Sequence, residues 1–235
     1  MRLMAITPFW RSDSAGAVGA CCGQCKVNVM VLRWLGALLV VLAMLAGASH
    51  EPRAAPATNP SAFIDNLANQ ALKILNEALP EAERERRFKP ILQDNFDIPR
   101  ISRFVLGRHW SAASDQEKQE FQTVFADYLL RTYANLFGKY NGQTVKVDRV
   151  EPAGENTSVV YSQIIDPAGA PPVKVVWRVI GTANDYRISD VSVDGVSQLL
   201  TYRDEFADVM QRQGGGVSTL IRLLRERLSS AGGGT

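Results

Sequence analysis

The sequence predicts a single α+β domain in which helices from both ends of the chain cover a four-stranded antiparallel sheet. Three observations predict this fold class. Apolar residues recur at three- and four-residue steps up to about residue 140, as on one face of a helix. After Asn141-Gly142 the apolar period changes to two, through four short segments separated by turn residues. Helical spacing then returns from Tyr202 onward, and no internal repeat is present.

Composition limits the class of protein. Of the 235 residues, 46% are apolar and 21% are charged, which is ordinary for a globular chain and excludes a disordered, collagenous or multi-span membrane protein. The formal net charge is +2, but residues 1–57 hold five basic and two acidic residues, so the remainder is near −1. Such a balance argues against a nucleic-acid partner.

The N-terminal residues 1–57 are interpreted as a signal peptide. Leu35 to Ala48 is an uncharged apolar run of 14 residues, shorter than the ~20 that a membrane-spanning helix needs. Arg33 precedes it, and Ala55-Pro56-Ala57 fits the small-residue cleavage pattern. An uncleaved anchor or a buried helix is the alternative. Met30 offers a more compact start for the same signal. We therefore expect one exported domain at 58–230 and a flexible tail at 231–235.

All the cysteines lie in this leader. They are Cys21, Cys22 and Cys25, of which Cys22 and Cys25 form a C-x-x-C pattern. No further zinc ligands lie nearby, so neither a metal nor a redox site is expected there. No cysteine follows the apolar run, which disfavours a lipid-anchored lipoprotein. The exported domain would fold in an oxidising compartment without disulfides, and its length permits a sufficient core.

The helices before the sheet are set by their caps and apolar stripes. Asn59-Pro60 offers an N-cap followed by proline, and Ser114 with Glu117 forms a capping box. Pro90 is expected to end or kink the second helix. The helices expected in this half of the chain lie at about 60–78, 81–89, 98–107 and 115–139.

The remaining segments complete the sheet and its cover. Turn residues at 166–172 and 183–185 separate alternating apolar segments, so the strands should pair as a meander. The expected strands are 144–150, 157–165, 173–181 and 186–193. The closing helices are expected at 202–212 and 217–228, joined by three glycines.

The residues offer little catalytic chemistry. His109 is the one histidine after the leader, and its surroundings do not resemble a nucleophile elbow, so a serine triad is not expected. A single histidine without cysteines gives no metal constellation. Gly214 to Gly216 follow a helix and lack the Lys-Ser/Thr pair of a phosphate loop. The pattern indicates binding rather than catalysis.

Five segments in order resemble a known family. Phe96 to Trp110 (FDIPRISRFVLGRHW) resembles the signature of the MlaC, or toluene-tolerance, periplasmic lipid-binding proteins. The similar segments that follow are Tyr128 to Tyr133, Pro171 to Arg178, Asp190 to Ser197, and Glu205-Phe206 leading to Gly214 to Gly216. The resemblance spans about residues 60–230. The hopanoid-associated branch of the same family is also similar.

This resemblance implies a fold, a function and partners. The fold would be a curled sheet like that of nuclear transport factor 2 (NTF2-like), covered by helices. The function would be to carry phospholipid through the periplasm, between an outer-membrane lipoprotein complex and an inner-membrane ABC transporter with its membrane-anchored substrate-binding subunit, which maintains outer-membrane lipid asymmetry. The family implies no cofactor, metal or catalysis. The rivals are an enzyme on the same fold acting on an apolar small molecule, and a polar-solute binding protein.

A carrier of this kind needs an apolar cavity for acyl tails, and the family places it between sheet and helices. The residues expected to line it are Phe104, Val105, Phe121, Phe125, Tyr128, Tyr133, Leu136, Val160, Val173, Val175, Trp177 and Val179. Arg100 and Arg103 are the expected contacts for a lipid head group, since guanidinium groups suit phosphate.

Overall fold

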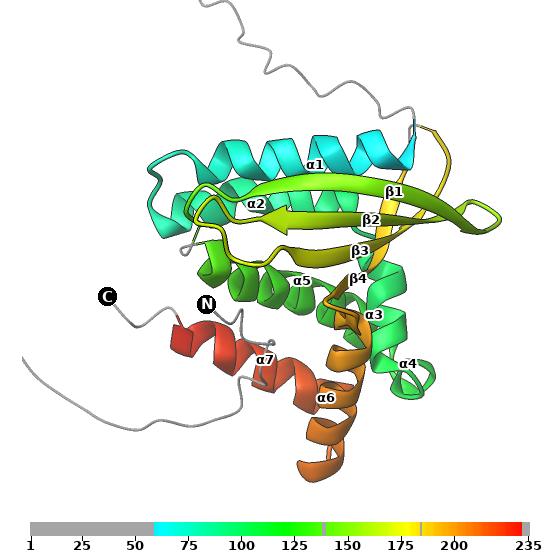
Figure 1. Cartoon of the computed structure of the whole chain (residues 1–235). Coiled ribbons are helices and arrows are strands. Elements are labelled where there is room, and N and C mark those ends of the chain that lie inside the picture. Colours follow the sequence, from blue (N-terminus) through cyan, green and yellow to red (C-terminus); the bar gives the residue numbers. More distant parts are fainter. Residues whose placement is uncertain (1–58, 138–139, 184, 232–235) are drawn as a thin grey trace, which may run out of the picture. The chain divides into compact units, whose positions relative to one another are not determined.

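The computed structural model describes residues 59–137, 140–183 and 185–231 (Figure 1), without the side chains of 134–137 and 231. The expected leader at 1–57 and nearly all of the expected tail lie outside these residues. The helices are α1 (Pro60–Leu75), α2 (Glu81–Asn95), α3 (Ile98–Leu106), α4 (His109–Ala112), α5 (Asp115–Phe137), α6 (Gln198–Arg212) and α7 (Val217–Ala231). The strands are β1 (Thr144–Gly154), β2 (Thr157–Ile165), β3 (Val173–Ile180), β4 (Arg187–Val193) and β5 (Val196–Ser197). Within the described ranges, no helix is both long and apolar enough to cross a membrane.

The sheet is an antiparallel meander in the order β1-β2-β3-β4-β5. This confirms the α+β class and the four expected strands, to which the structure adds the two-residue β5. In Figure 1, α1 and α2 lie along one side of the sheet and α5 along another. Helix α6, which follows the sheet, starts beside β4. Helices from both ends of the chain therefore pack on the sheet, as the sequence predicts.

The helix N-termini follow the capping residues. The Asn59 side chain accepts a hydrogen bond from Ala62 N at 2.8 Å, and Pro60 occupies the first turn. The Ser114–Glu117 capping box is confirmed in both directions: Glu117 N donates to Ser114 Oγ at 3.2 Å, and Ser114 N donates to Glu117 Oε2 at 2.8 Å. Local sequence therefore determines where α1 and α5 begin.

The structure differs from the local expectations at three places. The expected end of the second helix at Lys89 was wrong, because α2 continues through Pro90 to Asn95. The reason is packing: Ile91 contacts the sheet side and Leu92 contacts the helical side, which holds the helix together past the missing N–H. The chain also forms the short helix α4, which the sequence did not indicate.

The third difference is the start of α6, which the sequence places at Tyr202 and the structure places at Gln198. Ser197 is its N-cap and accepts from Leu200 N at 3.2 Å, while Asp190 on β4 accepts from Leu199 N at 3.4 Å. A strand residue therefore helps to cap this helix, which spacing along the chain could not reveal.

Most of the buried apolar side chains in the described residues belong to one of two cores. The larger, which we call the helical core, joins α3, α5, α6 and α7. The smaller, the sheet core, joins Phe63, Ile64 and Leu67 of α1 to residues of β2, β3 and β4. Phe96 packs against both, just before α3.

Candidate functional site

The register places the predicted strand residues on one face of the sheet, which we call the inner face. Val160 lies opposite Trp177, and Val179 lies opposite Ile188. Residues directly opposite each other share a face, and alternate residues of one strand do too. Val173, Val175, Trp177 and Val179 therefore point to the same side, where α1 packs on Val160 and Val179.

A hydrogen bond fixes the tryptophan on this face. The Trp177 indole donates from Nε1 to Ser162 Oγ at 2.8 Å, and Ser162 donates in turn to the Val175 carbonyl at 3.2 Å. Ser162 is itself buried. The indole N–H is thereby satisfied without water, so Trp177 presents an apolar ring at a defined place.

Protein covers the inner face incompletely. Val160, Val173, Val175 and Val179 are buried. Apolar neighbours on the same face nevertheless keep part of their surface exposed: Val145, Val147, Ile164, Trp177, Val191 and Val193. An apolar face whose side chains are only partly covered by the fold is a candidate for an apolar ligand.

The predicted helical residues lie in the other core. Phe121 and Phe125 are 0% exposed and stack with ring centroids 5.3 Å apart. Phe206 of α6 meets both rings edge-on, at 6.0 and 5.4 Å. Val105 is buried in the same cluster. The structure therefore does not bring these residues together with the inner face, and their contact with a ligand stays a prediction.

Three tyrosines lie in or beside the helical core. Burial raises the pKa values of Tyr128 and Tyr133 on α5 and of Tyr202 on α6. The Tyr202 hydroxyl is buried beside that of Tyr133, without a hydrogen bond of good geometry. All three phenols are therefore neutral at physiological pH. The side chain of Leu136, the last predicted helical residue, lies outside the described residues.

The predicted head-group residues lie at the surface. Arg100 is exposed and pairs with Asp97 at 3.2 Å, and Arg103 is exposed as well. Phe104, expected to contact acyl tails, is 37% exposed and belongs to neither core. These three residues of α3 form a surface group, whereas the inner face of the sheet is a separate feature.

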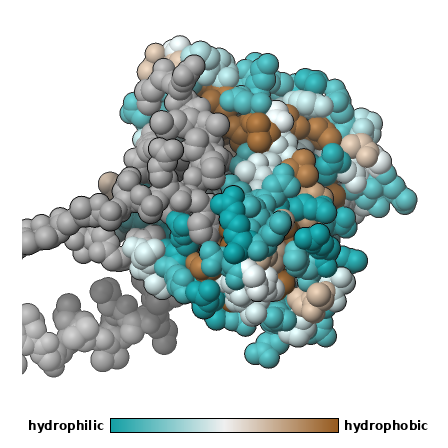
Figure 2. Space-filling view, turned by 90° about the horizontal axis from the view of Figure 1, so that it is seen from below, coloured by the Kyte–Doolittle hydropathy of each residue, from teal (hydrophilic) through white to brown (hydrophobic). Residues whose placement is uncertain are grey.

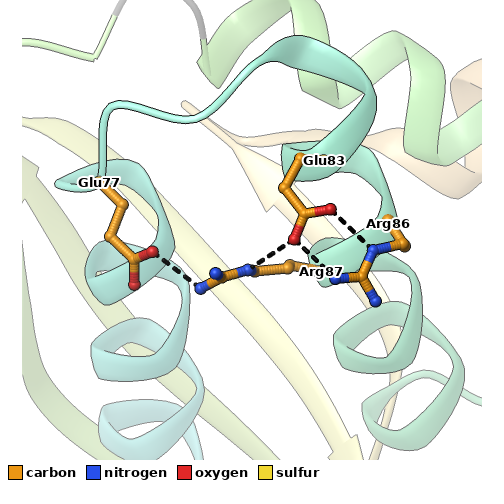
Figure 3. Close-up of polar contacts among 4 residues, drawn as sticks. All are labelled: Glu77, Glu83, Arg86 and Arg87. Carbon is orange, nitrogen blue, oxygen red and sulfur yellow. Dashed lines mark hydrogen bonds and ion pairs between the residues drawn. The ribbon is translucent and has the colours of Figure 1, made fainter. Parts of the chain in front are cut away.

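The most strongly shifted carboxyl is structural. Glu83 accepts from Arg86 at 2.6 Å and from Arg87 at 3.1 Å, and Arg87 also donates to Glu77 at 2.8 Å (Figure 3). Hydrogen bonds from Arg86 and then Arg87 lower the pKa of Glu83 to about 2. Glu77 follows α1 and Glu83 begins α2, so this network ties the α1–α2 turn and does not form a reactive acid.

A groove of about 630 Å³ lies between the start of α5 and α7. Its walls include Glu120 and Arg225, which form an ion pair at 2.5 Å, and none of the predicted site residues lines it. Figure 2 shows hydrophobic side chains reaching the surface in small groups among hydrophilic ones. The groove is therefore a feature separate from the inner face.

Sequence reasoning missed several residues of the candidate site, and it missed Phe96 as the link between the two cores. The missed residues of the inner face are Val145, Val147, Ser162, Ile164, Val191 and Val193. Val147 and Ser162 lie opposite each other on the inner face, and Val191 lies opposite Trp177. Alternation along β2 already put Ser162 in line with Val160, which was the available signal. The others depend on strand register and on the tertiary position of Phe96.

Fold and site define a helix-covered antiparallel sheet with an incompletely sealed apolar face. The profile of the family described as MlaC protein matches residues 65–226. The chain belongs to this family.

Two curated relatives and one solved structure are similar to the chain. It is 27% identical over 166 residues to toluene tolerance protein ttg2D of Pseudomonas putida, across 70% of this chain and 66% of that protein. It is 23% identical over 128 residues to the intermembrane phospholipid transport system binding protein MlaC of Haemophilus influenzae, across 53% and 59% of the two. The matches thus span two thirds or less of these relatives.

The solved structure is a phospholipid-binding protein from Ralstonia solanacearum in complex with a phospholipid. It matches with a TM-score of 0.66 and 26% identity, over 76% of this chain and 99% of that one. The two chains therefore share the fold across nearly all of the Ralstonia protein.

Proposed function

We propose that this protein is a periplasmic carrier that holds the acyl tails of a phospholipid and moves the lipid between the outer membrane and an inner-membrane ABC transporter, which maintains outer-membrane lipid asymmetry. The observation that carries the proposal is the apolar inner face left partly uncovered, in a fold shared with a protein solved in complex with phospholipid. Membership of the MlaC family, and the name of the Haemophilus relative, support the transport role.

The energetics require such a face. Two tails of ~16 carbons hold roughly 30 methylenes, and each costs about 0.8 kcal/mol to expose to water, or about 25 kcal/mol in all. A carrier that leaves the membrane must cover these tails, whereas a charged head group can stay in water. A set of valines with one tryptophan suits flexible chains because it is apolar and offers few polar groups.

The inner face is therefore the proposed tail site. Trp177, Val191 and Val147 combine partial exposure with a position beside buried valines. Phe121 and Phe125 act in this proposal by supporting the helices around the site, because other aromatic rings already surround them. Arg100 and Arg103 remain the proposed head-group contacts, as exposed cations on α3.

The proposed activity is binding and transfer without catalysis. The two curated relatives are described as a toluene tolerance protein and as a binding protein of a phospholipid transport system. Within the described part of the chain, no cluster of three or more His, Cys, Asp or Glu side chains could hold a metal ion. The carboxyl of Glu83 is committed to arginines. An enzyme on this fold would need an acid or base on the inner face, where the described side chains are chiefly valines.

Native mass spectrometry of protein purified from its own periplasm tests the proposal. The expected result is a bound mass of one diacyl phospholipid per chain, released unchanged after denaturation. A bound hopanoid would assign the protein to the hopanoid-associated branch and contradict the phospholipid proposal. Free fatty acid or lysolipid formed in proportion to protein would support an enzyme instead. A protein free of lipid, which also takes none from vesicles, would refute the carrier.

A further inference from the structure

Most arginines in the described residues form ion pairs. Ion pairs hold Arg86, Arg87 and Arg131 near α2, Arg212 on α6, and Arg222 and Arg225 on α7. Among the described residues, Arg84 on α2 and Arg178 on β3 are single arginines without an ion pair, whereas Arg103, Arg108 and Arg203 lack one as a group, and all three are exposed. Three uncompensated guanidinium groups therefore gather around the C-terminal end of α3.

The geometry brings them to one surface. Asp97 N, at the start of α3, donates to the Ile188 carbonyl at 2.9 Å, and Leu199 N, at the start of α6, donates to Asp190 at 3.4 Å. Both helices thus start at β4 and run side by side. The Arg203 guanidinium lies over the Phe104 ring, 5.1 Å from its centroid. This cation–π contact holds Arg203 in place.

The conformation of Gly107 keeps that guanidinium close. Gly107 ends α3 with φ +51°, and a Cβ placed there would lie 3.2 Å from the nearest Arg203 nitrogen. A side chain at this position would crowd the guanidinium group. The absence of a side chain at Gly107 therefore lets Arg203 lie across the end of α3.

Exposed apolar side chains accompany the charges. Leu200 is 52% exposed and lies one turn before Arg203 on α6. Phe104 is 37% exposed and lies one turn after Arg100 on α3. We call this surface the arginine face: Arg100, Arg103, Phe104, Arg108, Leu200 and Arg203. Its acidic neighbours are Asp97, which pairs with Arg100, and Asp204, so positive charge remains in excess.

We propose that the arginine face docks the protein onto a bilayer surface that carries anionic phospholipid. The proposal rests on the carrier function, because a lipid carrier must reach a surface where lipid is exchanged. Phosphate groups are complementary to uncompensated guanidinium groups, and long arginine side chains can reach them while Phe104 and Leu200 enter the interface.

The size of the apolar surface favours a bilayer over a folded protein partner. A specific protein interface buries about 800 Å² on each side around an apolar core. Here the apolar contribution is two protruding side chains among cations, which is enough for interfacial anchoring. The small excess of charge predicts a weak, salt-sensitive contact, which allows the carrier to leave the membrane again.

Vesicle flotation tests this proposal with the full chain as purified from the periplasm. The probes are vesicles of phosphatidylethanolamine and phosphatidylglycerol (3:1) and vesicles of phosphatidylcholine alone. We expect binding to the first that weakens with salt, and little binding to the second. The Arg108→Gln/Arg203→Gln protein should bind anionic vesicles about fivefold more weakly per arginine removed, the factor for ~1 kcal/mol.

The matched control is Arg86→Gln/Arg222→Gln, which removes the same charge from exposed, ion-paired arginines elsewhere. It should bind like the natural protein. A second variant, Leu200→Ser, should weaken binding and keep the salt dependence, since it removes an apolar anchor and no charge. Circular dichroism confirms that each variant is folded.

The outcomes separate this proposal from the carrier function. Native mass spectrometry on the same preparations reports bound lipid. The docking proposal is overturned if lipid-loaded protein binds both kinds of vesicle equally, or if the control variant loses as much binding as Arg108→Gln/Arg203→Gln. In both cases the bound lipid shows that the carrier function still holds. A carrier that binds neither vesicle also overturns the docking proposal and would direct the search to an acidic protein partner.

Discussion

The helical core and the sheet core of this protein differ in how completely they are filled. In the described residues, sixteen buried apolar side chains make up the first and six the second. Four aromatic rings, those of Phe121, Phe125, Tyr202 and Phe206, interlock in the helical core. The sheet core instead borders on apolar residues that stay partly exposed, such as Trp177 and Val191. One region is therefore filled by its own side chains, and the other, which is less completely covered, is the one we propose to hold the lipid tails.

The largest expected effect is a loss of stability caused by truncating a side chain of the helical core. Phe125→Ala should reduce the free energy of unfolding by about 3–5 kcal/mol, because it removes a fully buried ring whose neighbours cannot collapse into the space. Urea denaturation measures this loss. Phe104→Ala is the control, since it truncates an exposed aromatic residue and should cost far less. A loss below about 1 kcal/mol at Phe125 would mean that this ring lines a cavity.

The comparison also shows what the sequence could reveal. Periodicity and caps predicted the α+β class, the order of the long helices and the meander, because each depends on residues near in the chain. The expected end of the second helix before Pro90 was wrong, because Ile91 and Leu92 pack on two different cores and hold α2 together past the proline. The start of α6 depends on Asp190, which a strand supplies.

The candidate site was half predictable. Alternation on β3 identified Val173, Val175, Trp177 and Val179 as one face, which the register confirms. The apolar stripe of α5 carries no information on its partner, and the structure packs Phe121 and Phe125 against α6 rather than the sheet. A stripe shows that a helix face is buried, but tertiary contacts decide against what.

The next effect uses the tyrosines of the helical core. Burial raises the pKa of Tyr202, so above pH ~10 the unfolded chain releases its phenol proton first and the native state loses stability. The loss should be about 1.4 kcal/mol per pH unit for each such tyrosine. Tyr202→Phe removes a buried hydroxyl without a good partner, so it should match the natural protein at pH 7 and exceed it at pH 11. Thermal melting of both proteins at pH 7 and pH 11 measures this difference. If the natural protein and Tyr202→Phe lose the same stability between pH 7 and pH 11, the prediction is contradicted.

A substitution on the inner face of the sheet should change stability less than the substitutions above, but it should strongly reduce lipid binding. Val191→Trp places an indole on the partly exposed inner face opposite Trp177, so unfolding should change by less than about 1 kcal/mol while bound lipid is lost. Val176→Trp is the matched control, because Val176 lies on the neighbouring strand and the opposite face. Denaturation and native mass spectrometry are measured together. Full lipid content in Val191→Trp would place the lipid elsewhere.

The smallest effect is expected at the α1–α2 turn, which lies outside both regions and joins the helices that cover the sheet. Arg87→Gln removes a donor to both Glu77 and Glu83. Because the folded-state pKa of Glu83 is lowered to about 2, its contribution to stability is complete above the ordinary carboxyl pKa and is lost as pH falls toward 2. The natural protein should therefore melt slightly above the variant at pH 7, and the difference should vanish near pH 2 and shrink in high salt, since exposed pairs are screened. Melting curves of both proteins, recorded at each pH and salt concentration, give this difference directly. A gap that persisted at pH 2 would mean that Arg87 acts through packing of its side chain rather than through its ion pairs.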